Sequence, residues 1–183
     1  MDEKQLIRKI QKGDTSAFGY FVDTYQDMAI TIAFRICGNR QDAEDVVQNA
    51  FVKAFHNIYT FRSDSKFSTW FYRIVYNTAI TETRSAAHNM EFVDYKQMNT
   101  SYSDLDTMAQ IEENERKAIV NKALDQMPGD EGALLTLFYL EDSSVKEIAQ
   151  ITGLTDANIK VKLHRARKRF ADTVNHLMRH EAI

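Results

Sequence analysis

Cationic side chains near the C-terminal end of the chain could bind a phosphate backbone. Between Thr155 and Phe170, six basic residues oppose one acidic residue, a local net charge of +5 in a chain whose net charge is −3. On a helix, the outward face of this segment carries Ala157, Val161, His164, Arg165 and Lys168. Cations gathered on one element of an acidic chain favour a nucleic-acid partner, and a solvated basic surface is the alternative. Val161 favours DNA, because an apolar side chain there could meet a thymine methyl group.

The residues before this segment predict a helix-turn-helix. Ser144 and Glu147 have the Ser-x-x-Glu spacing of a capping box, which opens a helix. The short turn Thr152-Gly153-Leu154 follows, and Thr155 can cap the next helix. Helix, three-residue turn and helix is the plan of many DNA-binding units. Apolar residues between 116 and 140 supply the core that supports it.

Aromatic side chains are dense in residues 59–76, and basic residues lie among them. On a helix, Tyr72 and Tyr76 lie on a different face from Phe71, so we expect some rings to face outward. Residues 61–67 combine rings, cations and small polar groups, as a pocket for an unstacked base requires. Composition alone favours the alternative, aromatic packing in a helical core.

Residues 42–55 predict an amphipathic helix with a broad apolar stripe. The opposite face collects Asp42, Asp45, Gln48, Asn49 and Val52. Acidic residues near the start of a helix stabilise it through the helix dipole, so Asp42 and its neighbours need no binding partner to explain them. On this interpretation the face is simply exposed to solvent. A binding surface is the other interpretation, and the residue types alone favour the solvated face.

The composition predicts a helical protein. The 183 residues include one Pro, six Gly and one Cys, so long stretches are free to be helical and no intramolecular disulfide can form. No apolar run approaches the roughly 20 residues needed to span a bilayer, which predicts no membrane insertion. No secretion signal opens the chain, and we expect a cytoplasmic protein.

The middle of the chain is acidic. Residues 86–115 hold one basic and seven acidic residues, with little helical periodicity before Leu105. We therefore expect a flexible acidic linker over residues 86–112. It would join two small helical domains, residues 1–85 and residues 113–183, in an all-α fold.

Three motifs, in this order along the chain, resemble the extracytoplasmic-function (ECF) group of the sigma-70 family of RNA polymerase sigma factors. The motifs are Asp42-Ala43-Glu44-Asp45-Val46-Val47-Gln48, Phe67-Ser68-Thr69-Trp70-Phe71-Tyr72-Arg73-Ile74 and Leu163-His164-Arg165-Ala166-Arg167-Lys168-Arg169. The resemblance covers nearly the whole chain. It implies that the N-terminal domain is the family's region 2, a helical bundle, and that the C-terminal domain is region 4, which carries the helix-turn-helix. Such a protein binds core RNA polymerase, directs it to specific promoters and helps to melt the DNA for transcription initiation.

The resemblance also assigns residues to three sites. Core polymerase would be bound by Asp42, Asp45, Gln48 and Asn49. The minus-10 element, with a flipped base and a melted single strand, would meet Phe61, Arg62, Ser63, Lys66, Phe67, Trp70, Arg73, Asn77 and Arg84. The minus-35 element, as duplex, would meet Asn158, Lys160, Val161, His164, Arg165, Arg167 and Lys168. An anti-sigma factor is a further partner that the family usually implies.

Other functions have less support in the sequence. The chain contains no phosphate-binding glycine loop, no Gly-x-Ser-x-Gly and no cysteine cluster, so we expect no enzyme, no catalytic residue, no cofactor and no metal site. A sigma-like decoy that sequesters an anti-sigma factor is one alternative, but it would have no use for a basic recognition helix. A plain helix-turn-helix regulator is another, and it would leave the aromatic segment and the acidic helix unexplained.

Overall fold

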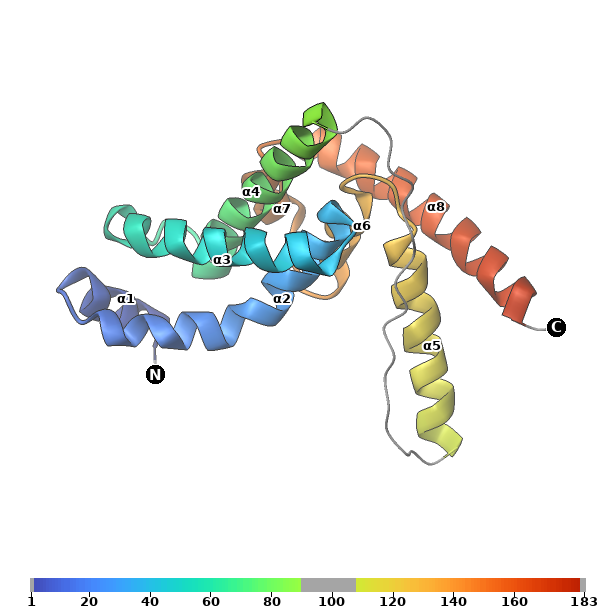
Figure 1. Cartoon of the computed structure of the whole chain (residues 1–183), viewed down its shortest axis with the longest axis horizontal. Helices are drawn as coiled ribbons and strands as arrows, with labels where there is room; N and C mark the ends of the chain where they lie inside the picture. The colour runs from blue at the N-terminus through green and yellow to red at the C-terminus, as the bar shows by residue number, and fades with distance from the viewer. Residues whose placement is uncertain (1, 90–107, 182–183) are drawn as a thin grey trace.

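The computed structural model describes residues 2–89 and 108–181, which form helices joined by short turns (Figure 1). Eight α-helices and two 3-10 helices, with no strand, make up these two ranges. The prediction of an all-α fold is confirmed. Within the same ranges, no helix is long and apolar enough to cross a membrane.

The N-terminal domain contains the first four α-helices. They are α1 (Glu3–Gln11), α2 (Gly19–Cys37), α3 (Arg40–Asn57) and α4 (Phe67–Asn89), with 3-10 helices η1 (Thr15–Phe18) and η2 (Ile58–Thr60). Gly38 ends α2 with φ of +77°, a conformation that favours glycine. The Asn39 side chain then caps α3 by accepting a hydrogen bond from the amide of Asp42. The apolar stripe predicted for α3 is buried in the domain core.

The C-terminal domain contains α5 (Met108–Asp125), α6 (Glu131–Tyr139), α7 (Val145–Thr152) and α8 (Asp156–Glu181). The predicted capping box is present at the start of α7: the Ser144 side chain accepts from the Glu147 amide, and the Glu147 side chain accepts from the Ser144 amide. Gly153 ends α7 with φ of +75°, which allows the tight turn into α8. Helices α7 and α8 therefore form the predicted helix-turn-helix.

Helix α4 has two buried faces. One packs against α2 and α3, and the other packs against α7 of the C-terminal domain. Buried residues of both domains form one continuous hydrophobic core. Tyr72 and Tyr76 are only 2% and 6% exposed. These two rings are buried because the C-terminal domain covers their face of α4. The ring of residues 59–76 that does face outward is that of Tyr59, which is 53% exposed.

The chain between α4 and α5 passes through the stretch predicted as the linker. Helix α4 continues to Asn89, and α5 begins at Met108. The predicted linker, residues 86–112, thus overlaps the end of α4 and the start of α5. Its residues 90–107 lie outside the described residues.

Candidate nucleic-acid interface

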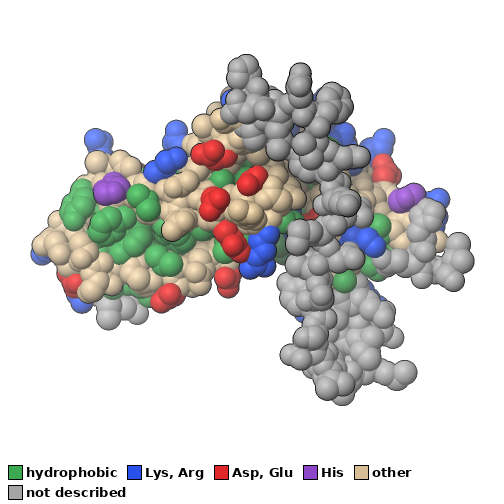
Figure 2. All heavy atoms as spheres, viewed as in Figure 1, with side chains coloured by type: hydrophobic (Ala, Val, Ile, Leu, Met, Phe, Trp, Pro, Cys, Tyr) green, Lys and Arg blue, Asp and Glu red, His purple; other side chains and the backbone are tan. Residues whose placement is uncertain are grey.

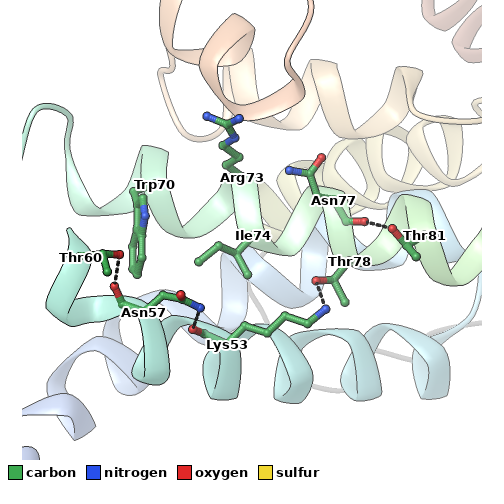
Figure 3. A pocket seen from close by; sticks show the side chains of 9 residues that line it. All are labelled: Lys53, Asn57, Thr60, Trp70, Arg73, Ile74, Asn77, Thr78 and Thr81. Atoms are coloured by element: carbon green, nitrogen blue, oxygen red, sulfur yellow. Dashed lines mark hydrogen bonds between the residues drawn. The ribbon is translucent and has the colours of Figure 1, made fainter. Parts of the chain in front are cut away.

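A pocket of about 450 Å³ lies between α3 and α4 (Figure 3). It combines an indole ring, two cations and several amides and hydroxyls. The lining residues are Lys53, Asn57, Thr60, Trp70, Arg73, Ile74, Asn77, Thr78 and Thr81. An aromatic plane beside cations and hydrogen-bonding groups suits an unpaired nucleotide, because the ring can stack on a base while the cations meet its phosphate.

Short hydrogen bonds order the α3 side of this pocket, as Figure 3 shows. Lys53 Nζ donates to Thr78 Oγ1 across 3.1 Å, and Asn57 Nδ2 donates to the Lys53 carbonyl across 2.7 Å. The Thr60 hydroxyl donates to the Asn57 carbonyl across 2.7 Å. Because Thr78 is neutral, this contact positions the Lys53 ammonium without cancelling its charge. The cation therefore remains available to an anion that enters the pocket.

The loop before α4 is held by its aromatic rings. Phe61 and Phe67, both predicted at the minus-10 site, are buried rather than exposed. Their ring centroids lie 5.0 and 5.5 Å from that of Trp70, so they support the indole from behind. Gln11 of α1 anchors the same loop by donating to the carbonyls of Ile58 and Phe61 across 2.9 and 3.1 Å. Trp70 is thus the ring of this cluster that lines the pocket.

The polar residues predicted at the minus-10 site divide into three groups. Arg73 and Asn77 are exposed and line the pocket beside Trp70. Arg62, Ser63 and Lys66 are exposed on the loop, whereas Arg84 is exposed farther along α4 and does not line the pocket. The structure adds residues that the sequence analysis missed, namely Lys53, Asn57, Thr60, Thr78 and Thr81.

Lys66 is paired with the other domain. Its ammonium lies 2.8 Å from Oε1 of Glu147 on α7. The hydrogen bond and the charge of Glu147 raise the pKa of Lys66. In turn, the hydrogen bond from Lys66, together with those from Ser144, lowers the pKa of Glu147 to about 2. The loop cation and the helix-turn-helix carboxylate are therefore both charged at neutral pH.

The polar face of α3 is exposed, as predicted. Asp42, Asp45, Gln48 and Asn49 all lie at the surface. Asp42 also closes the reciprocal cap of α3, because its carboxylate accepts from Asn39 Nδ2 across 2.7 Å. Figure 2 shows acidic side chains gathered over α3 and its neighbours, with a hydrophobic area near the C-terminal end of α3. Val52 and Tyr59 are exposed in that part of the chain.

Helix α8 presents the cationic face that its sequence predicts. The exposed residues include Asn158, Lys160, Val161, His164, Arg165 and Lys168, and Val161 is 50% exposed. Arg167 is exposed as well, and its guanidinium also lies over the rings of Phe138 and Tyr139, 5.0 and 5.6 Å from their centroids. Arg167 therefore packs on α6 as well as carrying charge.

Comparison with known proteins matches both domains to one family. The family model described as Sigma-70 region 2 matches residues 21–89, and the one described as Sigma-70, region 4 matches residues 117–170. The ECF RNA polymerase sigma factor SigW of Bacillus subtilis is 30% identical over 90% of this chain and 92% of its own. The RNA polymerase sigma-H factor of Pseudomonas aeruginosa is 30% identical over 97% of this chain and 96% of its own.

Solved structures share the fold. CnrH, in complex with the cytosolic domain of CnrY, superposes with a TM-score of 0.65 at 22% identity and covers 93% of this chain and 96% of its own. The sigma factor RpoE of Bartonella quintana, in complex with the anti-sigma factor NepR, has a TM-score of 0.67 at 20% identity and covers 86% of this chain and 96% of its own.

A helix-turn-helix with an exposed cationic face, joined to a helical domain with a polar pocket, is typical of a DNA-binding transcription factor. The chain belongs to the sigma-70 family of RNA polymerase sigma factors, in its ECF group. Proteins of this family are regulatory subunits of RNA polymerase and not enzymes.

Proposed function

We propose that this sigma factor recruits core RNA polymerase through the exposed face of α3 and directs it to promoters read by two separate surfaces. The pocket between α3 and α4 captures an unpaired base of the minus-10 element. The outward face of α8 reads the minus-35 element in the major groove. The observation that carries this proposal is the pocket itself, because Trp70 lines it together with the two cations Lys53 and Arg73.

The mechanism uses binding energy to open DNA. Extruding a base costs a few kcal/mol, and stacking on an aromatic side chain returns about 1–3 kcal/mol per base. Trp70 supplies that plane, and its position is fixed by Phe61 and Phe67 behind it. Lys53 and Arg73 attract the phosphates of the melted strand, and Asn77 offers an amide to a base edge.

The α8 surface reads duplex DNA. Arg165 and Lys160 are exposed and can reach guanine edges, while Val161 can contact a thymine methyl group. Lys168 meets the phosphate backbone and sets the register of the helix. Arg167, which rests on two aromatic rings of α6, orients the helix and adds charge at its flank.

The same proposal implies where the protein acts and what regulates it. The protein acts in the cytoplasm, where it joins core polymerase as a single copy. An anti-sigma factor is its expected regulator, which the structures of CnrH with CnrY and of RpoE with NepR support by analogy.

The test is run-off transcription by core RNA polymerase on a pool of genomic promoter fragments, with and without the protein. Asp45→Arg and Arg165→Ala probe the polymerase and minus-35 surfaces, and Lys53→Gln probes the pocket. Protein-dependent transcripts that all three variants weaken are the expected result. Failure to bind core polymerase would instead favour a decoy or a plain helix-turn-helix regulator.

A further inference from the structure

Helix α1 carries cations that the proposed function does not use. Arg8 and Lys9 lie in its last turn and Lys12 follows it, and all three are exposed. Arg8 and Lys12 are four residues apart and share one face of the helix, whereas Lys9 lies on another face. The dipole of α1 favours basic residues near its C-terminal end, which accounts for Arg8 and Lys9 equally. A role beyond helix stability has to come from what lies beside the face that Arg8 and Lys12 share.

That face adjoins the segment that leads into the pocket. Gln11 follows Arg8 by three residues, so the two side chains are neighbours on α1. The Gln11 amide donates to the carbonyls of Ile58 and Phe61 across 2.9 and 3.1 Å. These two carbonyls bracket the exposed part of η2, where Thr60 lines the pocket (Figure 3). Because α1 also packs against η2, its cationic face lies beside the η2 rim of the pocket.

The cations at this rim are not neutralised by the protein. Within the part of the chain that the structure describes, Arg8, Lys12 and Arg62 form no ion pair and no side-chain hydrogen bond. Arg62 directly follows the residue whose carbonyl Gln11 binds, so it adds a third positive charge at this place. Glu3 is the one acidic residue of α1, and its carboxylate accepts from the hydroxyl of Tyr25 instead. Free cations gathered at one end of a pocket favour a phosphate ligand.

An exposed aromatic ring lies on the same segment. Tyr59 of η2 directly precedes Thr60 and is 53% exposed. A ring with an accessible face can stack on an unpaired base, as Trp70 is proposed to do inside the pocket. Charge alone would suit duplex and single-stranded DNA alike, whereas a ring beside the charges favours a single strand.

We propose that Arg8 and Lys12, together with the ring of Tyr59, form a second single-strand subsite that holds the DNA strand where it leaves the pocket over η2. This inference rests on the proposed function of the pocket. Each of the two cations meets a phosphate, and the ring stacks on a base outside the pocket. Lys4 lies one turn before Arg8, at the end of α1 away from η2, and is outside the subsite. The subsite adds affinity that does not depend on the base sequence, because phosphates and ring faces are common to every nucleotide.

The experiment uses the full chain and exposed side chains, so that folding is preserved. The double variant Arg8→Gln/Lys12→Gln removes both cations and keeps good helix formers. The matched control is Lys4→Gln/Lys9→Gln, which removes the same number of exposed cations from the same helix but outside the subsite. Tyr59→Leu removes the ring and keeps an apolar side chain. Circular dichroism verifies that each variant remains helical.

Two lengths of single-stranded DNA separate the subsite from the pocket. A mixed-sequence oligonucleotide of about 3 nucleotides is shorter than ordinary single-strand sites and can fill only the pocket, whereas one of about 15 nucleotides can also reach α1. Trp70 is the single tryptophan of the chain and lines the pocket, so its fluorescence reports binding of either length. Titrations at several salt concentrations give the affinity and the slope of log K against log salt. Lys53→Gln reports on the pocket in the same titrations.

The expected losses differ between the two kinds of contact. Arg8→Gln/Lys12→Gln should bind the long oligonucleotide about tenfold or more weakly and lower the slope by about 1.4, which is two phosphate contacts at about 0.7 each. Tyr59→Leu should weaken binding of the long oligonucleotide by about fivefold or more with little change in slope, because stacking involves no charge. Neither variant should alter binding of the short oligonucleotide, and the control pair should alter neither length.

Several outcomes would overturn the subsite. One is an unchanged affinity of Arg8→Gln/Lys12→Gln for the long oligonucleotide while Lys53→Gln weakens both lengths, which would leave the pocket in place. Another is an equal loss in the control pair, because any cation of α1 would then serve. An equal loss of affinity for a hairpin duplex of mixed sequence would overturn the assignment to a single strand.

The proposed function of the pocket can fail separately. If Lys53→Gln alters neither length while the α1 double variant weakens binding of the long oligonucleotide, α1 binds single-stranded DNA and the role assigned to the pocket is overturned. If the native chain binds neither oligonucleotide, the subsite and the pocket are overturned together.

Discussion

Arg35 on α2 forms an ion pair with Asp125 at the end of α5, and this contact joins the two domains. The Arg35 side chain is only 5% exposed. A second hydrogen bond runs from Arg35 Nη2 to Asn121 Oδ1 across 3.0 Å. Burial lowers the pKa of Arg35 to about 10, so the guanidinium is still charged at neutral pH.

Replacing this guanidinium should loosen the association of α5 with α2. We expect Arg35→Met to lower the free energy of unfolding by about 1–3 kcal/mol, because buried hydrogen bonds to a charged group are lost while Asp125 can be hydrated. Urea unfolding followed by circular dichroism measures the change. Arg40→Gln is the control, since it removes an exposed pair with Glu44 worth less than about 0.5 kcal/mol. Equal stabilities of Arg35→Met and the native chain would contradict the role given to this contact.

Reversing a charge on α3 should weaken polymerase binding. Asp45 is exposed and, unlike Asp42, takes no part in the α3 cap. We expect Asp45→Arg to raise the Kd for core polymerase by about tenfold or more, because a like charge would face the complementary surface. Fluorescence anisotropy with labelled protein gives the Kd. Asp172→Arg, the same change on exposed α8, should leave it unaltered.

Removing the pocket cation should change how DNA binding depends on salt. We expect Lys53→Gln to weaken single-strand binding and to lower the slope of log K against log salt by about 0.7, the loss of one phosphate contact on a single strand. Titrations at several salt concentrations measure the slope. Lys4→Gln on α1 removes an exposed cation outside the pocket and should leave the slope unchanged. If Lys53→Gln leaves the slope of log K against log salt unchanged, Lys53 does not contact a DNA phosphate.

Two arginines of α8 should behave differently when truncated. Arg165→Ala should cost about 1–3 kcal/mol of promoter-duplex binding and leave stability unchanged, because its side chain is exposed. Arg167→Ala should also lower the melting temperature, because its guanidinium packs over Phe138 and Tyr139. Gel-shift titration and thermal melting of both variants test this contrast, and identical melting of the two would refute it.

The Lys66–Glu147 pair should give a pH-dependent stability. The pKa of Glu147 is lowered from 4.5 to about 2, so its contribution is fully present above pH 4.5 and is lost as pH falls towards 2. The melting temperature of the native chain should exceed that of Glu147→Gln at neutral pH, and the gap should close across this range. Added salt should narrow the gap at neutral pH, because the Lys66 end is exposed. A gap that stays constant down to pH 2 would exclude the ion pair as its cause.

Local signals in the sequence predicted much of the fold. The Ser144 and Glu147 capping box and the glycine after α7 are short-range features, and the structure places each where its residue type requires. The apolar stripe of α3 and the cationic face of α8 also follow from helical periodicity alone. Each of these features depends on a few residues that are neighbours along the chain. They could therefore be predicted from this single sequence.

Features that depend on contacts between helices were not predictable in the same way. Periodicity placed Tyr72 and Tyr76 on their own face of α4, but it could not tell that the other domain covers that face. Lys53 lines the pocket only because α4 packs beside the turn of α3 that carries Lys53. Phe61 and Phe67 were expected to meet a base, and their burial behind Trp70 follows from packing across the loop.

Cys37, the last residue of α2 and the single cysteine of the chain, is 7% exposed. Burial, with the nearby charges of Asp42 and Glu82, raises the pKa of its thiol to about 11. The reactive thiolate is therefore scarce at neutral pH, and maleimide dyes should spare it in the native protein. A cysteine introduced at an exposed site can then be labelled selectively in the otherwise unaltered chain, and labelling of Cys37 itself would report unfolding.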